Sequence, residues 1–178
     1  MTFAPTITTA RLTLRHHRLE DFEPMAALFA TDWAKYMGGP FAEHDFWAMF
    51  GADVASWQWF GFGTWAVDLT ETGEFIGQIG INKPPNFPET EIGWCILPGF
   101  EGKGLAFEAA SAARDWAFEN TGLTTLVSYI HPENARSIAL AEHLGAVKDP
   151  AAPRSDPEDL VYRHPHPDEF QGGMEAYA

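Results

Sequence analysis

Cysteine is almost absent from this sequence, which contains a single thiol at Cys95. One cysteine can form no disulfide within the chain, and this suits a reducing compartment, so we expect a cytoplasmic protein. Basic residues are scarce as well, because 11 Lys and Arg stand against 25 Asp and Glu and give a formal net charge of −14. Such an acidic chain argues against nucleic acid as a partner and allows a cationic substrate.

Long hydrophobic runs are also missing. No stretch approaches the roughly 20 apolar residues that span a membrane, and residues 1–17 lack the apolar core of a signal peptide, so we expect no membrane association. The chain has 178 residues, of which 46% are hydrophobic and 14% aromatic. This composition predicts one globular domain, 1–178, with a core over about 8–164. The tail, 165–178, has no periodicity, and we expect it to be extended or partly mobile.

The most informative stretch is an apolar segment, a glycine-rich turn and a helical pattern in succession. Residues 91–97 form a short apolar run that predicts a buried strand. Gly102 and Gly104 then allow a tight bend and the close approach of a ligand. From Leu105 apolar residues recur at helical spacing until Gly122, which suits a helix C-terminal cap. A glycine turn at a helix N-terminus directs free N–H groups at one point, which predicts a phosphate site.

Two common phosphate motifs do not fit this turn. A P-loop would need Gly where Leu97 stands and a hydroxyl side chain where Gly104 stands. A dinucleotide fingerprint would need a third Gly at the position of Phe107. An ordinary strand–turn–helix with two turn glycines remains as an alternative.

The turn, Glu101-Gly102-Lys103-Gly104-Leu105-Ala106, follows a strand ending in Ile96-Leu97-Pro98. In this order it resembles the acetyl-CoA pyrophosphate loop of the GNAT superfamily of N-acetyltransferases. That loop is usually Gln/Arg-x-x-Gly-x-Gly/Ala, so Glu101 departs from the pattern at its first position.

A second motif of the same family lies further along the chain. Asn134 is followed by Ser137 and by a helical pattern that ends in Leu144-Gly145. This resembles the family's Asn, two residues, Ser and a helix ending in Leu-Gly and a hydrophobic residue, here Ala146. Residues 9–15 also resemble the first strand of the branch that acetylates ribosomal-protein serine and alanine N-termini.

The resemblance implies an α+β fold. We expect a central, mostly antiparallel, twisted sheet with a splayed strand pair, flanked by about four helices. The residue patterns themselves predict a half-buried first strand over 7–15, in which Arg11, Thr13 and Arg15 face outward, and a Gly- and Pro-rich loop at 36–40. Further strands are predicted over 64–69, 74–81, 91–97, 123–130, 147 and 160–163. Helices are predicted over 19–30, 43–56, 105–122 and 134–144.

The activity that the resemblance implies is direct transfer of the acetyl group from acetyl-CoA, without a metal, to a primary amine. The amine would belong to a protein N-terminus or a small molecule, and the enzyme would be a monomer or a homodimer. The implied cofactor contacts are main-chain groups of Trp94, Cys95, Ile96 and Leu97 for the pantetheine arm, backbone N–H groups of Gly102, Lys103, Gly104, Leu105, Ala106 and Phe107 for the pyrophosphate, and Asn134.

Two side chains are our candidates for proton transfer. Glu91 is the only carboxylate on the predicted signature strand, so it is the candidate base, and the alternative is an exposed charge at a strand end. Many family members place a Tyr seven residues after the Asn, but that position is Ala141 here. Ser137 is therefore the candidate donor to the leaving thiolate, with Tyr129 and His131 as substitutes. The alternative for Asn134 is a helix cap and nothing more.

Three further alternatives stay open. The aromatic residues between 46 and 65 could form a wall of the acceptor pocket, or the core or a dimer contact, and we favour the latter for most of them. The chain could be an acyl-CoA-binding module without transferase activity. It could also be a nucleotide-binding enzyme, which would need a metal held by the acidic pair Glu101 and Glu108.

Overall fold

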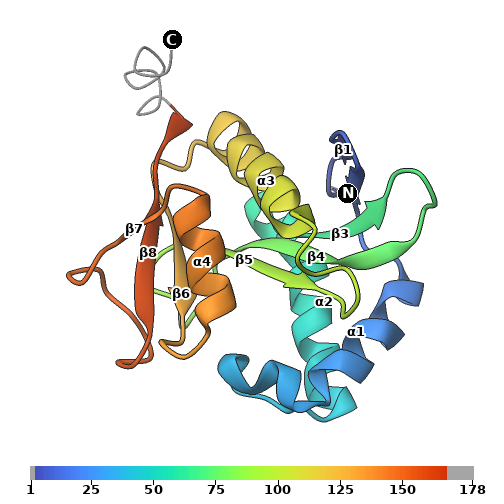
Figure 1. Cartoon of the computed structure of the whole chain (residues 1–178), viewed down its shortest axis with the longest axis horizontal. Helices are drawn as coiled ribbons and strands as arrows, with labels where there is room; N and C mark the ends of the chain where they lie inside the picture. Colours follow the sequence, from blue (N-terminus) through green and yellow to red (C-terminus); the bar gives the residue numbers. More distant parts are fainter. Residues whose placement is uncertain (1–2, 168–178) are drawn as a thin grey trace.

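The computed structural model describes residues 3–167 and centres on one eight-stranded sheet (Figure 1). The strands are β1 (Ile7–Thr8), β2 (Leu12–Arg15), β3 (Thr64–Leu69), β4 (Phe75–Asn82), β5 (Glu91–Ile96), β6 (Leu126–Ile130), β7 (Val147–Lys148) and β8 (Leu160–His164). The helices are η1 (Leu19–Asp21), α1 (Phe22–Phe29), η2 (Asp32–Met37), α2 (Glu43–Phe60), α3 (Leu105–Thr121) and α4 (Ala135–His143), where η marks a 3-10 helix.

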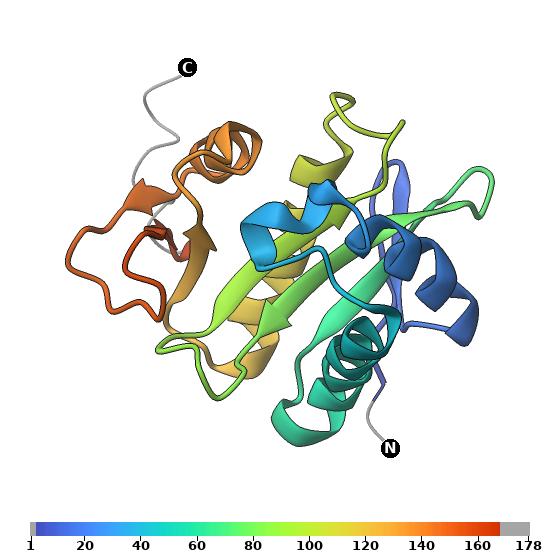
Figure 2. The same cartoon turned by 90° about the horizontal axis from the view of Figure 1, so that it is seen from below.

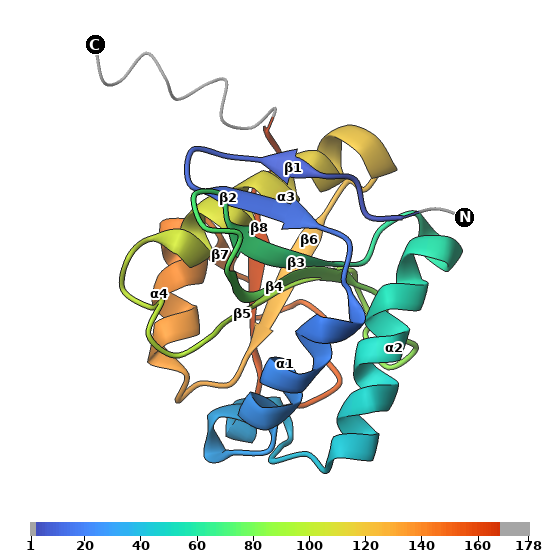
Figure 3. The same ribbon diagram turned by 90° about the vertical axis from the view of Figure 1, so that its right-hand side faces the viewer.

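The strands are arranged in the order β1-β2-β3-β4-β5-β6-β8-β7. Figure 3 shows β1 to β5 side by side in this order. All neighbours are antiparallel except β5 and β6, which run parallel and have one registered pair, Glu91 with Val127. The predicted mixed sheet with a splayed strand pair is therefore confirmed, and the splay lies between β5 and β6.

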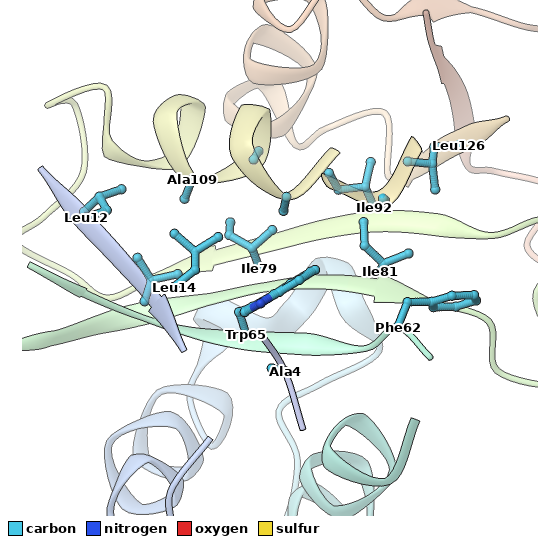
Figure 4. Packing of buried hydrophobic residues seen from close by; sticks show 14 of the residues in the cluster. Ala4, Leu12, Leu14, Phe62, Trp65, Ile79, Ile81, Ile92, Ala109 and Leu126 are labelled. Atoms are coloured by element: carbon cyan, nitrogen blue, oxygen red, sulfur yellow. The ribbon is translucent and has the colours of Figure 1, made fainter. Parts of the chain in front are cut away.

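Helices cover both faces of the sheet. Helix α3 lies on one face, where small residues such as Ala109 pack with Ile79 and Ile92 (Figure 4), and Ala113 belongs to the same core. Helices α1 and α2 lie on the opposite face (Figure 2), where Met25 and other apolar side chains form a second core. Because small residues face the sheet, α3 can pack closely on it, and this fixes where its N-terminus lies.

The first strand was predicted as one segment, and this is wrong. A turn at residues 9–11 divides it into β1 and β2, which pair as a hairpin. The Thr9 N–H donates to the Leu12 carbonyl at 2.9 Å, and the Leu12 N–H donates to the Thr9 hydroxyl at 3.0 Å. A threonine hydroxyl that accepts a hydrogen bond from a backbone N–H three residues further on stabilises a turn rather than an extended strand.

Arg15 was expected to face outward, yet it is buried. Its guanidinium donates to both oxygens of Asp68 on β3 at 2.6 and 2.8 Å and to both oxygens of Asp21 in η1 at 2.7 and 2.9 Å. These bonds raise the pKa of Arg15 above its ordinary value, and Asp21 has a pKa well below its usual range. A paired and hydrogen-bonded charge can be buried at the end of a strand, which alternation alone does not reveal.

The segment between the first and third strands also differs from prediction. Helix α2 continues to Phe60 instead of ending near Ser56, and η2 occupies residues 32–37, which includes the start of the Gly- and Pro-rich loop expected at 36–40. Of the aromatic residues between 46 and 65, five are buried, namely Phe46, Phe50, Trp57, Phe62 and Trp65, and three are largely exposed, namely Trp47, Trp59 and Phe60. The assignment to the core therefore holds for most of the set.

No helix in the described part of the chain is long and apolar enough to cross a membrane. The expectation of an extended or mobile tail concerns residues 165–178, and most of that range, 168–178, lies outside the described residues.

Candidate active site

A cavity of about 640 Å³ opens where β5 and β6 separate. Its wall is built by η2, β5, the loop that leads into α3, β6 and the first turns of α4. One end lies at the glycine-rich loop and the other at η2. Ten of the predicted site residues contribute to the wall: Glu91, Trp94, Ile96, Gly102, Gly104, Leu105, Ala106, Phe107, Asn134 and Ser137. Cys95, Leu97 and Lys103 are not part of it.

The glycine-rich end has the geometry of an anion site. Gly104 is the N-cap residue of α3 with a φ of +75°, and Gly102 has a φ of +72°, a left-handed conformation that suits glycine. Because Gly104 has no side chain, it leaves the first N–H groups of α3 without a side-chain cap. These N–H groups and the helix dipole favour a phosphate at this point.

Arg11 supports this loop from the turn between β1 and β2. Its guanidinium donates to the Lys103 carbonyl at 2.9 Å and to the Glu108 carboxylate at 2.6 Å. Glu108 also accepts from the Thr9 hydroxyl at 2.6 Å and from the Arg11 N–H at 2.8 Å. The N-terminal hairpin therefore holds the loop and the first turn of α3 together.

The structure explains why glutamate is tolerated at position 101. Its carboxylate accepts from the Gly99 N–H at 3.0 Å and pairs with the Arg136 guanidinium of α4 at 3.1 Å. The backbone bond from Gly99, followed by Arg136, lowers the pKa of Glu101. The ionised carboxylate thus faces an arginine, which offsets its repulsion of a phosphate.

Apolar side chains on the two faces of β5 have different surroundings. Ile92, Trp94 and Ile96 pack on the side of α3 and α4, whereas Cys95 joins the core under α1 and α2. The Cys95 thiol is buried, and burial raises its pKa above the ordinary value. It is therefore neither near the cavity nor ionised enough to serve as a nucleophile.

Ser137 contacts β5 through a hydrogen bond that sequence analysis did not predict. The indole N–H of Trp94 donates to the Ser137 hydroxyl oxygen at 3.2 Å. The hydroxyl oxygen accepts from the indole, so its own proton stays available to another acceptor in the cavity. This arrangement suits a donor to a sulfur atom lying between β5 and α4.

Asn134 caps α4, as its residue type predicts. Its Oδ1 accepts from the Ser137 N–H at 3.2 Å. This bond fixes the N-terminal turn of α4 and with it the position of Ser137. Asn134 also lines the cavity, and the cap bond uses only the oxygen of its amide, so the NH2 group is not needed for capping.

Glu91 is not an exposed charge at a strand end, so that alternative is wrong. The residue is half-buried and lines the cavity. Burial raises the pKa of Glu91 to about 8, and the negative charges of Asp159 and Asp53 act in the same direction. The backbone N–H of Tyr129 favours the charged carboxylate and acts against them. A carboxyl group with a pKa of about 8 is ionised at higher pH and can then accept a proton from an amine.

The η2 end of the cavity is aromatic, and sequence analysis missed it. Tyr36 of η2 stacks on His131, with ring centroids 5.0 Å apart, and Trp33 lies beside it in the wall. His131 and Tyr129, named as substitute donors, both line the cavity, but each has a structural bond. Tyr129 accepts from the Glu89 N–H at 3.1 Å, and the His131 ring accepts from the Glu133 N–H at 3.2 Å.

The acidic pair that a metal-dependent nucleotide enzyme would need is engaged elsewhere. Glu101 pairs with Arg136, and Glu108 pairs with Arg11. Over residues 3–167, no group of three or more His, Cys, Asp and Glu side chains is placed to hold a metal ion.

Comparison with known proteins gives consistent results. A model of the acetyltransferase (GNAT) domain matches residues 11–147. The crystal structure of an acetyltransferase from Agrobacterium tumefaciens str. C58 is 52% identical, with a TM-score of 0.88, and the match covers 91% of this chain and 95% of that chain. The uncharacterized N-acetyltransferase p20 of Bacillus licheniformis is 30% identical over 151 residues, which is 81% of this chain and 83% of that protein.

A shorter match involves the uncharacterized protein YkkB of Bacillus subtilis (strain 168), 35% identical over 88 residues. It spans 48% of this chain and 51%, about half, of that relative. Ribosomal-protein-S5-alanine acetyltransferase from Vibrio fischeri has the same fold, with a TM-score of 0.68, 18% identity and coverage of 93% of this chain and 98% of that chain.

The chain belongs to the GNAT acetyltransferase family. It is an acetyl-CoA-dependent N-acetyltransferase whose fold is shared with the ribosomal-protein acetyltransferases.

Proposed function

We propose that this enzyme transfers the acetyl group of acetyl-CoA directly to a primary amine. One observation carries the proposal: a single cavity joins the uncapped N-terminus of α3, the Ser137 hydroxyl and the Glu91 carboxyl. Acetyl-CoA fits this order, with its pyrophosphate at the N–H groups of residues 102–107 and its pantetheine arm along main-chain groups of residues 94–97. Asn134 contributes its amide to the arm or to the adjoining phosphate.

The chemistry follows from this placement. The amine nitrogen attacks the thioester carbonyl carbon, so that a C–N bond forms and the C–S bond breaks. Glu91 takes the proton that the amine loses, directly or through water. A backbone N–H near Cys95 or Ile96 polarises the carbonyl oxygen. Ser137 donates a hydrogen bond from its hydroxyl group to the departing thiolate and keeps its proton.

Direct transfer is favoured over an acetyl-enzyme intermediate by the position of the one thiol. Cys95 is 4% exposed, lies in the core under α1 and α2 and does not line the cavity. The acceptor would enter from the η2 end, where Tyr36, His131 and Glu91 lie. The acidic chain and the carboxyl groups near Glu91 favour a cationic acceptor, which is a protein N-terminus or a small amine. A cytoplasmic location and a monomeric or homodimeric state remain predictions from the sequence.

An amine panel tests the proposal. Thiol release from acetyl-CoA is followed with N-terminal peptides, polyamines, aminoglycosides and amino-acid-like amines, and thermal shift measures acetyl-CoA binding in parallel. We expect stabilisation by acetyl-CoA and release that depends on one class of amine. Stabilisation without release for any amine would favour the acyl-CoA-binding module.

Ser137→Ala should lower kcat without any rescue at high pH. The loss should lie at the lower end of the roughly 100- to 10,000-fold range of a lost acid–base group. It should be smaller for an acyl donor with a more acidic thiol, because that leaving group needs less protonation. Trp94→Phe is the matched control, since it removes the indole N–H bond and leaves the hydroxyl, and its loss should be smaller. A Ser137→Ala enzyme with wild-type kcat would remove Ser137 from the reaction.

Asn134→Ser should separate capping from cofactor binding. Serine caps a helix about as well as asparagine, so the melting temperature should change little. If the Asn134 amide also contacts acetyl-CoA, the Kd should rise roughly fivefold to tenfold, because one hydrogen bond is lost. Calorimetric titration measures the Kd. An unchanged Kd with an unchanged melting temperature would leave Asn134 as a cap only.

A further inference from the structure

Ser128 lies in β6 at the point where the sheet opens. The two parallel strands are registered at the single pair Glu91 and Val127, where the Val127 N–H donates to the Thr90 carbonyl at 3.1 Å. In a regular parallel ladder, the next N–H of β6 to bond would be that of Tyr129, and its acceptor would be the Ile92 carbonyl. The Ile92 carbonyl is instead bonded to a side chain.

The Ser128 hydroxyl donates to the Ile92 carbonyl at 2.7 Å. The Tyr129 N–H instead interacts with the Glu91 carboxylate, whose charged form it favours. The Ile92 carbonyl, which would otherwise join β5 to β6, is thus satisfied by the Ser128 hydroxyl, and the strands can stay apart without leaving this carbonyl unpaired.

His164 on β8 fixes the direction of the serine hydroxyl. Its Nε2 lies 2.9 Å from the Ser128 oxygen, and the two residues are 3% and 2% exposed. A carbonyl can only accept, so the Ser128 proton points to Ile92 and the histidine must donate Nε2–H. Burial, aided by the charge of Arg114, lowers the pKa of His164 to about 3, so the ring stays neutral near pH 7.

We propose that Ser128, oriented by His164, is a positioning residue that holds β5 and β6 apart where the acyl end of acetyl-CoA passes between them. The inference rests on the proposed function. Ser128 itself lines the cavity. If the Ser128 hydroxyl were removed, the Ile92 carbonyl would lose its hydrogen-bond donor. The next donor in a regular parallel ladder is the Tyr129 N–H. The ladder would then gain one bond, the gap would narrow, and Glu91 would lose its backbone partner.

Ser128→Ala tests the proposal, with acetyl-CoA and ADP as calorimetric probes. ADP contains a pyrophosphate but no pantetheine arm, so it reports on the glycine-rich loop alone. We expect a roughly tenfold rise in the Kd and KM for acetyl-CoA and no change in the Kd for ADP, because the lost serine bond leaves a buried carbonyl to pair across the gap. Ser128→Thr keeps the hydroxyl and should restore acetyl-CoA affinity.

His164 provides a second route that does not alter the cavity wall. His164→Gln keeps an N–H donor for Ser128 and should bind acetyl-CoA as the wild type does, whereas His164→Leu should resemble Ser128→Ala. Wild-type affinity in Ser128→Ala, or equal losses for acetyl-CoA and ADP, would overturn the inference. If the wild type itself fails to bind acetyl-CoA, the proposed function fails and this inference with it.

Discussion

Replacing Gly104 by aspartate is expected to weaken acetyl-CoA binding by roughly 100-fold or more, since a carboxylate would stand at a helix N-terminus that must hold a diphosphate. Space is not the obstacle, because a Cβ at this position would meet only the Arg11 guanidinium at 3.5 Å. Aspartate is also a good N-cap residue and would engage the N–H groups that phosphate needs. Calorimetric titration with acetyl-CoA measures the loss, and thermal shift shows whether the ligand still stabilises the fold.

Two control variants separate charge from backbone strain. Gly104→Ala introduces a side chain at the same positive φ without a charge and should weaken binding far less. Gly73→Asp makes the same change at a φ of +71° in the turn between β3 and β4, where a Cβ meets nothing within 4 Å. It should leave acetyl-CoA affinity unchanged. If Gly104→Asp binds acetyl-CoA as well as the wild type does, the loop is not the phosphate site.

Glu91→Gln is expected to remove one inflection from the pH dependence of kcat/KM. In the wild type, kcat/KM should rise with pH through about 8, because Glu91 has a pKa raised to about 8 by burial and accepts a proton only when ionised. An alkyl amine such as a lysine side chain has a pKa of about 10.4 and gives a separate, higher inflection. The glutamine variant should keep only the amine's inflection. At pH 8 its kcat/KM should be roughly 100- to 10,000-fold lower than that of the wild type.

Asp53→Asn provides the matched control for this experiment. The Asp53 charge contributes to the raised pKa of Glu91, and the half-buried Asp53 has a pKa raised to about 7 by burial. Removing that charge should move the lower inflection to a lower pH and retain it. Profiles of Glu91→Gln and the wild type that differ only by a constant factor would mean that Glu91 transfers no proton.

The parts of the fold and site that sequence analysis predicted are set by neighbours along the chain. The turn glycines, the apolar spacing of α3 and the cap at Asn134 each depend on contacts within one element and its connecting loop. The two motifs then sufficed to indicate the family, which the comparisons show. The positions of most helices and strands followed from local patterns of apolar residues, which either recur at a regular spacing or form a short continuous run.

The parts that sequence analysis missed depend on residues far apart in the chain. Arg15 is buried because Asp68, 53 residues away, lies opposite on β3. The bond between Trp94 and Ser137 spans 43 residues, and the bond between Ser128 and His164 spans 36. Local patterns contain no signal for these pairs. The aromatic end of the cavity was missed for a related reason, since η2 lacks an apolar periodicity and reaches the cavity only through the tertiary fold.

A single-turnover experiment tests the central claim of direct transfer to an amine most directly. Enzyme in excess is mixed with acetyl-labelled acetyl-CoA and an amine from the panel, quenched at short times, and analysed for label on the enzyme and on the amine. We expect label to leave acetyl-CoA and reach the amine at the same rate, with no labelled enzyme at any time and no loss of label when the amine is omitted. Label that first accumulates on the protein, or that leaves acetyl-CoA without reaching an amine, would contradict the account.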